Sequence, residues 1–284
     1  MALWFTLRMK ITLWGVRGSY PAPGPHTLRY GGATSCVSVE TPEMVLVLDG
    51  GTGIIALGDR LLLTADPRPI FVLLTHAHLD HVFGLPFFAP LYDEGREVTF
   101  FNLHLGDAEW TPLSLFDGRY VPTRPATLRA RLRVVTPSDT IAVLREAGLD
   151  LAVLPVNHPG GAYAYRITHG GHSLVYAPDS EISPPIPFVS PAALAAFCRG
   201  TDVLIHDAQY TDADLPLKRG WGHSRVSEAC ALAEASGAAH LVLFHHDPYR
   251  TDEAVDALQA EARAALRPSG IRCDAACEGW TMGW

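Results

Sequence analysis

The chain has 284 residues, of which 48% are hydrophobic and 18% are charged, as in an ordinary globular protein. The formal net charge of −8 disfavours a generic nucleic-acid binder, because such proteins hold phosphates with a basic surface. Five dispersed cysteines without a CxxC pair indicate buried thiols in a reducing compartment, and no membrane span or signal peptide is recognisable, so we expect a cytoplasmic protein that binds no membrane.

Strand-like runs separated by turn residues follow one another along the chain, with a few helical patterns between them. The first strand begins near Met9, and residues 1–8 are interpreted as an N-terminal extension, either an upstream start or an extra edge strand. Strands are predicted at residues 10–16, 36–40, 44–49, 69–75, 97–103, 128–134, 151–156, 162–168, 173–178, 202–207 and 240–245. Helices are predicted at residues 53–63, 191–199, 224–237 and 251–266, the third with Ser224 as its cap. This order predicts sheets covered by helices, and because no linker is recognisable we expect residues 1–284 to form a single domain.

A cluster of metal-ligand side chains stands at the end of the strand predicted at residues 69–75. The stretch "THAHLDH" contains His76, His78, Asp80 and His81 within six residues. Burying four such groups together is costly unless a cation pairs with them. Loops at strand ends are also where a rigid scaffold presents functional groups. We therefore predict a metal site at this turn.

Further ligand-type residues follow later strands: His158 in "LPVNHPGG", Asp179 in "LVYAPDSE", and His245 or His246 in "LVLFHHDP". Imidazole and carboxylate ligands suit zinc, and also manganese or iron. A single zinc ion uses about four ligands, so seven candidates favour two ions with one carboxylate bridging them.

The motif T-H-A-H-L-D-H resembles the H-x-H-x-D-H motif of the metallo-β-lactamase superfamily. An earlier "LDGGTG" and the three later motifs follow in the order that this family uses, from about Trp14 to the C-terminus. The resemblance implies an α+β fold, a four-layer αβ/βα sandwich of two mixed sheets flanked by helices, with two Zn²⁺ ions per chain. Manganese or iron remains an alternative metal.

The same resemblance implies a role for each residue of the metal site. One ion would be held by His76, His78 and His158, and the other by Asp80, His81 and His245, with Asp179 as the bridge. Asp49 would brace the ligand loop without touching metal. His246 remains an alternative to His245, although the strand register and the family order both favour His245.

Two further motifs indicate the reaction. "LIHDAQY", with His206 and Asp207, and "GWGHSRVSEA", with His223, resemble elements of the tRNase Z-like enzymes, in which a carboxylate orients a histidine toward the scissile phosphate. Asp207 stands where the usual residue is Glu. The resemblance implies catalytic roles for Asp80, Asp207 and His223 and a supporting role for His206. A histidine kept protonated by its carboxylate partner can protonate a leaving oxygen.

Candidate substrate contacts lie in the glycine-rich loop after the first strand and near His223. They are Arg17, Ser19, Thr34, Ser35 and Lys218, which can offer donors to an anion. The alternative for the loop is an ordinary Gly/Pro surface loop.

Residues 107–125 show no periodicity and are interpreted as an inserted loop that closes over the active site. Trp110, Phe116 and Tyr120 would offer stacking surface to a base or sugar. The alternatives are that these aromatic side chains fill a gap in the core or form a contact in a homodimer.

These features favour a hydrolase, because two metal ions activate water for attack on an acyl or phosphoryl centre. Asp179 stands where true β-lactamases have a cysteine, which disfavours antibiotic hydrolysis. We expect a phosphodiesterase acting on a small phosphodiester, including a cyclic one. The alternatives are hydrolysis of an acyl or lactone group, a nuclease resembling the tRNA 3′-processing enzymes, and a non-hydrolytic metal-binding sensor. No long tRNA-gripping arm is recognisable, and residues 104–135 are the only comparable insert.

Overall fold

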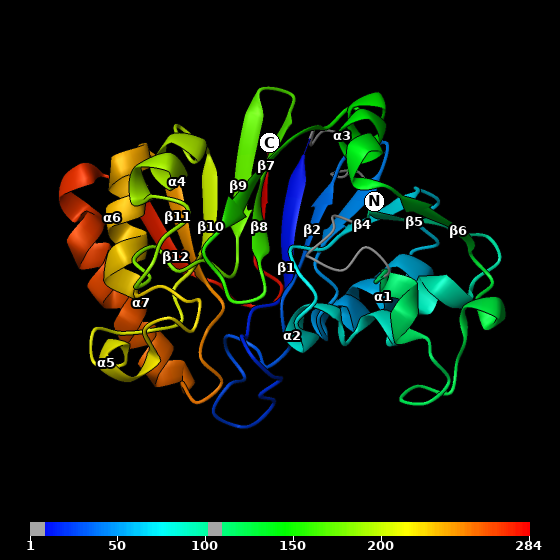
Figure 1. Cartoon of the computed structure of the whole chain (residues 1–284), viewed down its shortest axis with the longest axis horizontal. Coiled ribbons are helices and arrows are strands. Elements are labelled where there is room, and N and C mark those ends of the chain that lie inside the picture. Colours follow the sequence, from blue (N-terminus) through cyan, green and yellow to red (C-terminus); the bar gives the residue numbers. More distant parts are fainter. Residues whose placement is uncertain (1–8, 102–109) are drawn as a thin grey trace.

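The computed structural model describes residues 9–101 and 110–284. Within these ranges the strands form two mixed sheets whose outer faces are covered by helices, so the expected sandwich is confirmed (Figure 1). The interpretation of residues 1–8 as an extension, and the first three residues of the insert, 107–109, lie outside the described residues.

The first sheet contains seven strands among the described residues, in the order β13-β1-β2-β3-β4-β5-β6. They are β1 (Lys10–Gly15), β2 (Cys36–Glu40), β3 (Val45–Leu48), β4 (Ile70–Leu73), β5 (Glu97–Phe101), β6 (Arg131–Val135) and β13 (Thr281–Gly283). Strands β3 to β6 are parallel, whereas β1 is antiparallel to both β2 and β13. The strand predicted at residues 128–134 overlaps β6, which lies at the edge of this sheet and carries Arg131 and Arg133.

The second sheet contains six strands within the described ranges, in the order β12-β11-β10-β9-β8-β7. They are β7 (Asp150–Val156), β8 (Ala162–His169), β9 (His172–Ala177), β10 (Val203–Asp207), β11 (His240–Phe244) and β12 (Arg272–Ala275). Because β8 is antiparallel to both β7 and β9, the strands β7, β9, β10 and β11 all point the same way. Their carboxyl ends therefore meet at one edge of the sheet.

Helices cover the outer face of each sheet, with α1 beside the first and α4, α6 and α7 beside the second (Figure 1). The α-helices are α1 (Gly53–Leu63), α2 (Leu79–Val82), α3 (Pro137–Glu146), α4 (Pro191–Phe197), α5 (Leu215–Lys218), α6 (Val226–Ser236) and α7 (Asp252–Leu266). Short 3₁₀ turns are η1 (Leu85–Phe87), η2 (Ala89–Tyr92), η3 (Pro112–Leu115), η4 (Pro125–Thr127) and η5 (Arg267–Ser269). No helix in the described part of the chain is both long enough and apolar enough to span a membrane.

The ends of α6 show how local sequence sets a helix boundary. Gly237 ends the helix in the left-handed conformation at φ 66°, which a glycine adopts without steric cost. The predicted cap Ser224 is wrong, because Arg225 occupies the cap position. The Ser224 hydroxyl instead donates to the carbonyl of Ser180 and accepts from the Ile182 amide. Ser224 therefore ties the start of α6 to the loop after β9.

An apolar core lies between the two sheets. Leu46 of β3 and Leu13 of β1 are fully buried in the same cluster as Val203 of β10 and Val242 of β11. Burial of such side chains is the main favourable term in folding, about 25 cal/mol per Å² of apolar surface. The rigid sheets hold the loops at their carboxyl ends in fixed positions, and those loops carry the candidate site.

Candidate metal centre

The turn from β4 into α2 presents the histidine-rich motif. His78 has an extended backbone at the position before α2, and Asp80 and His81 lie in the helix. Asp80 and His81 are buried, whereas Leu79 is 69% exposed. This short helix therefore directs its two ligand-type side chains inward.

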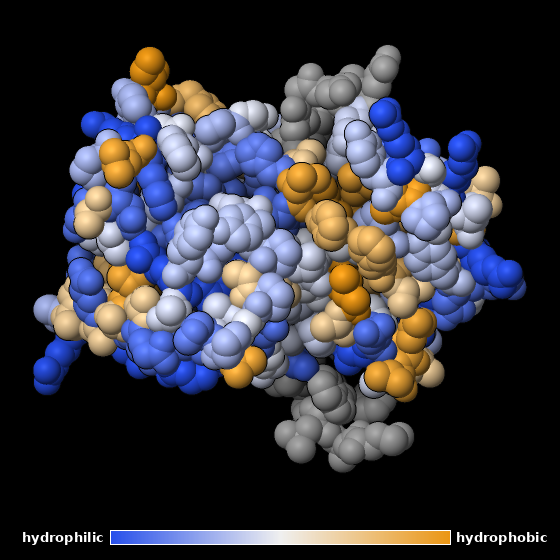
Figure 2. All heavy atoms as spheres, turned by 90° about the horizontal axis from the view of Figure 1, so that it is seen from below, coloured by the Kyte–Doolittle hydropathy of each residue, from blue (hydrophilic) through white to orange (hydrophobic). Residues whose placement is uncertain are grey.

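Apolar residues gather at the right of the molecular face in Figure 2, on the side where Figure 1 places α1 and α2.

The structure brings together the side chains assigned to the first ion. One candidate ligand atom from each of four residues lies within 4.8 Å of the others, and the group comprises His76, His78, His158 and Asp179. The Nδ1 atom of His78 lies 3.1 Å from the Nε2 atom of His158. The Oδ2 atom of Asp179 lies 3.7 Å from the His76 Nε2 atom and 3.6 Å from the His158 Nε2 atom.

A second group of the same kind comprises Asp80, His81 and His245. The Oδ2 atom of Asp80 lies 3.1 Å from the His245 Nε2 atom. The Oδ1 atom of Asp179 lies 2.9 Å from the His81 Nε2 atom and 3.2 Å from the His245 Nε2 atom. The two oxygens of Asp179 thus face the two groups, which is the geometry of a bridging carboxylate.

The choice between His245 and His246 follows from the backbone after β11. His245 has a φ of 61°, an uncommon conformation for a residue with a side chain. It directs its imidazole into the second group. His246 is buried elsewhere, and its Nε2 donates to the carbonyl of Ala276 at 2.9 Å. The structure therefore places His245, and not His246, in the second group.

Asp49, for which the resemblance implies a bracing role, forms hydrogen bonds to two residues of the ligand loop. Its Oδ1 accepts a 2.7 Å hydrogen bond from the Thr75 amide, and its Oδ2 accepts a 2.8 Å bond from Nδ1 of His81. Tyr176 of β9 donates its hydroxyl to the same carboxylate at 3.0 Å. Asp49 thus orients His81 so that its Nε2 faces the metal groups, and it links the two sheets.

Gln209 plays the corresponding role for His245 and was not recognised in the sequence. Its Oε1 accepts from Nδ1 of His245 at 3.0 Å, and its Nε2 donates to the Ser19 hydroxyl at 3.2 Å. The Ser19 amide in turn donates to Oδ2 of Asp80 at 2.7 Å. An amide two residues after Asp207 has no distinctive pattern, so only the folded structure reveals this connection.

These hydrogen bonds test whether a cation fits the site. His81 and His245 both hydrogen-bond to protein oxygens through Nδ1, which leaves their Nε2 atoms, 3.3 Å apart, facing the centre of the site. Among the described residues, buried His76 Nε2 and Asp179 Oδ1 have no hydrogen-bond partner. Unpaired buried polar atoms are costly, and cations held by the two groups would give all four atoms a partner. The donors present, imidazole and carboxylate, therefore fit a divalent metal centre.

The pKa shifts of these groups also agree with a cation at the site. Burial opposes a charge on His81, but Asp179, Asp80 and Asp49 raise its pKa well above the usual value. Burial also opposes a charge on Asp179, yet the neighbouring imidazoles hold its pKa well below the usual value. The pKa of His76 is lowered by burial and by His81. The carboxylates around His81 therefore favour positive charge at the centre of the cluster.

His223 lies beside both groups. Its ring centroid is 5.3 Å from that of His158 and 4.9 Å from that of His245. Its Nδ1 donates to Oδ2 of Asp207 at 2.8 Å. Asp207 also accepts from the amides of Ser180 and Gln209, so the carboxylate is fixed although it is one methylene shorter than Glu. His206 supports this turn, because its Nδ1 donates to the Asp207 carbonyl at 2.7 Å.

Burial works against the expected protonation of this pair. Burial lowers the pKa of His223, and this effect outweighs the nearby carboxylates of Asp179 and Asp80. Burial likewise raises the pKa of Asp207 well above the usual value. Asp207 therefore orients the His223 ring through Nδ1, and Nε2 is the ring nitrogen left to meet a substrate.

Three of the predicted substrate contacts need correction. Arg17 is fully buried, and its guanidinium donates to the carbonyls of Gly31, Asp247 and Arg250. Thr34 and Ser35 are also fully buried, and the Thr34 hydroxyl accepts from the Thr52 amide. The side chains of Arg17 and Thr34 hold the loop in place, and because all three residues are fully buried none of them reaches a substrate.

The predictions for Ser19 and Lys218 are compatible with the structure. Ser19 is exposed and contacts Asp80 through its amide. Lys218 pairs with Asp247 at 2.8 Å and lies 4.6 Å from the centroid of the Tyr210 ring. The Tyr210 ring contacts His223, with 5.4 Å between centroids. Both residues therefore lie close to the site.

The described part of the insert supplies core residues. Phe116 is buried in the cluster beneath α1, and Trp110 packs against the same cluster. This is the alternative in which the aromatic side chains fill a gap in the core. Tyr120 is 84% exposed. Closure of the insert over the site, with Tyr120 on a substrate, stays a prediction.

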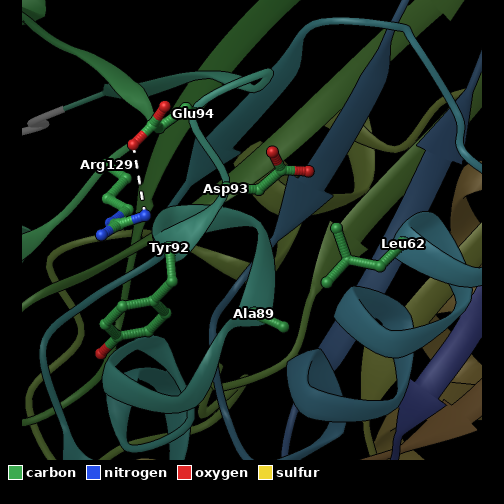
Figure 3. A pocket seen from close by; sticks show the side chains of 6 residues that line it. All are labelled: Leu62, Ala89, Tyr92, Asp93, Glu94 and Arg129. Atoms are coloured by element: carbon green, nitrogen blue, oxygen red, sulfur yellow. Dashed lines mark ion pairs between the residues drawn. The ribbon is translucent and has the colours of Figure 1, made fainter.

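Two pockets offer space for a ligand. A pocket of about 570 Å³ is lined by Leu62, Ala89, Tyr92, Asp93, Glu94 and Arg129 (Figure 3). It contains no member of the metal groups, and an ion pair joins Arg129 and Glu94 at 3.2 Å. A second pocket, of about 350 Å³, is lined in part by the candidate ligand His158. It therefore lies beside the candidate metal centre.

Comparisons with known proteins agree with this geometry. A family model described as "Beta-lactamase superfamily domain" matches residues 46–246. The probable metallo-hydrolase YhfI of Bacillus subtilis is 26% identical over 240 residues, covering 84% of this chain and 86% of YhfI. Its crystal structure superposes with a TM-score of 0.66 at 22% identity, covering 97% of this chain and 99% of that one.

Two other similarities involve proteins whose names concern phosphorus chemistry. A ribonuclease Z of Pseudomonas putida is 42% identical over 81 residues, a local match to 26% of this chain and 25% of the ribonuclease. The crystal structure of a diphosphatase from the PhnP family has a TM-score of 0.65 at 20% identity, covering 98% of both chains. The structural likeness, at this identity, concerns the fold.

Proposed function

The chain belongs to the β-lactamase superfamily as a metallo-hydrolase, and from this premise we propose that it is a phosphodiesterase with two metal ions that cleaves a small phosphodiester. His76, His78 and His158 would hold one ion, Asp80, His81 and His245 the other, and Asp179 would contact both. When bound, two zinc ions supply a water molecule of lowered pKa and stabilise negative charge on the phosphoryl oxygens.

The arrangement of Asp207 and His223 is the observation that supports phosphodiester cleavage. His223 lies against both metal groups, but its Nδ1 is committed to Asp207. An anionic substrate beside this buried imidazole would raise its pKa, and Nε2 would then carry the proton that the leaving oxygen needs. An ester with a poor leaving group requires such a proton donor.

The similarities to a ribonuclease Z and to a diphosphatase support chemistry at phosphorus. The net charge of −8 and the core packing of Phe116 support a small substrate over a long nucleic acid. Asp179, where β-lactamases of this family have cysteine, supports the same choice over lactam hydrolysis.

A panel of three chromogenic substrates tests the proposal. Zinc-loaded and manganese-loaded protein should hydrolyse bis(p-nitrophenyl) phosphate, and a chromogenic lactam and a lactone should be cleaved far more slowly. The same protein treated with a chelator is the control and should lose the diesterase activity. Lactone or lactam cleavage in the absence of diester cleavage would favour an acyl hydrolase, and inactivity of the metal-loaded protein on all three would favour a sensor.

A further inference from the structure

The pocket beside His158 is built mainly from apolar side chains on a proline-rich loop. Its lining comprises Asn157, His158, Pro159, Glu181, Pro184, Pro185, Ile186, Phe188 and Gly220. Its volume of about 350 Å³ lies within the range of small-molecule sites, about 300–1,000 Å³. We propose that this pocket binds an uncharged apolar group esterified to the substrate phosphate, and this inference rests on the proposed function.

The polar side chains of the lining are already engaged with backbone. Asn157 donates from Nδ2 to the carbonyls of Glu181 and Val189, at 3.1 and 2.8 Å. Its Oδ1 accepts from the amides of Phe188 and Val189, at 3.1 and 3.0 Å. An asparagine side chain has two donor hydrogens and two acceptor lone pairs, so Asn157 is fully used. It shapes the pocket and leaves no hydrogen bond for a polar ligand.

Glu181 is engaged in the same way. Its two oxygens accept from the amides of Gly220 and Gly222, at 2.8 and 2.9 Å. A negatively charged group entering the pocket would therefore meet this carboxylate without a free cationic partner among the lining residues. An uncharged group would not be repelled by this carboxylate.

The loop is held in a form that is ready to bind. Three prolines in "SPPIPF" each fix one backbone torsion, and the Asn157 hydrogen bonds secure the end of the loop. On this rigid loop Ile186 is 89% exposed and Phe188 is 65% exposed. Exposed apolar side chains gathered beside a catalytic site are the usual mark of a ligand surface.

The pocket is also connected to the reaction centre. Gly222, one of the two residues held by Glu181, accepts a 3.0 Å hydrogen bond from Nδ1 of His158, and His223 follows it. A group held in the pocket would thus place its attached phosphate beside the proposed metal ligand His158 and near His223. The pocket would select which ester is brought to the metals.

Binding of two phosphonates, which cannot be hydrolysed as esters, tests this assignment. By calorimetry, zinc-loaded protein should bind phenylphosphonate about 10-fold more tightly than methylphosphonate. 4-Carboxyphenylphosphonate, which adds a charge to the ring, should lose that advantage. Phe188→Ala and Ile186→Ser should each reduce the phenyl preference to roughly 3-fold or less, and as both residues are exposed, at least one variant should fold normally.

Leu63→Ser is the matched control, because Leu63 is 87% exposed on α1 and does not line the pocket. It should retain the phenyl preference. Equal binding of the two phosphonates by a protein that hydrolyses diesters would overturn the proposed role of the pocket. It would leave the proposed function standing. A phenyl preference that falls in Phe188→Ala, in a protein that hydrolyses no diester, would support the pocket and refute the proposed function.

Discussion

Asp179→Ala should retain at most one metal ion per chain and should lose hydrolysis of bis(p-nitrophenyl) phosphate. Its two oxygens face the two groups of ligands, so removal of this one side chain takes a ligand from both. The remaining imidazole nitrogens would also lose the carboxylate that offsets the charge of the ions. Elemental analysis of the folded variant, with thermal unfolding to confirm that it is folded, measures the effect.

Gln209→Leu is a milder variant that perturbs the same site. It removes the hydrogen bonds of Gln209 to Nδ1 of His245 and to the Ser19 hydroxyl, and it leaves every proposed ligand in place. Loss of such a supporting contact typically costs about 10–100-fold in metal affinity or activity, and the loss should fall on the second ion. The effect of Asp179→Ala should be larger. Wild-type metal content in Asp179→Ala would show that this residue is not the bridge.

His223→Ala should keep both ions and most of the stability while lowering turnover by roughly 10²–10⁴-fold, the usual effect of a positioned acid. Its Nδ1 is bonded to Asp207, and the proposed ligand groups are complete without it. The loss should be greatest for diphenyl phosphate, whose leaving group needs a proton. It should be smaller for bis(p-nitrophenyl) phosphate, whose leaving group departs readily as an anion.

Asp207→Asn tests whether the two residues act as a pair. Because Asp207 acts by orienting His223, adding Asp207→Asn to His223→Ala should cause little further loss. Equal losses for the good and the poor leaving group would remove the proton-donor role from His223. Loss of a metal ion in His223→Ala would instead identify His223 as a ligand, a possibility that its closeness to Asp179 and His245 makes worth measuring.

The elements that could be predicted from the sequence are those with strong local patterns. Helix α1 occupies the predicted residues 53–63, and each predicted strand from 10–16 to 240–245 contains or overlaps an observed one. The short terminal strands β12 and β13 and helix α3 were missed. Strands β12 and β13 have only four and three residues. Strand β13 pairs with β1, at the other end of the chain, and β12 pairs with β11 across helix α7.

The metal motif could be recognised in the sequence because four ligand-type side chains within six residues are unusual. The contacts that support the ligands have no such pattern and could not be recognised. Arg17 stood in a glycine-rich loop that suggested exposure. It is buried because carbonyls of Asp247 and Arg250, more than 200 positions later, accept its hydrogen bonds. The protonation of His223 likewise depends on burial, which tertiary packing decides.

The most direct test of the account is a zinc titration of metal-free protein, followed by calorimetry and by hydrolysis of bis(p-nitrophenyl) phosphate in the same samples. Binding should saturate at about two ions per chain, since the proposed ligands exceed what one tetrahedral site uses. Diester hydrolysis should rise with the second ion and stop increasing at that ratio. Saturation at one ion with full activity, or two bound ions without diester hydrolysis, would contradict a phosphodiesterase with a two-metal centre.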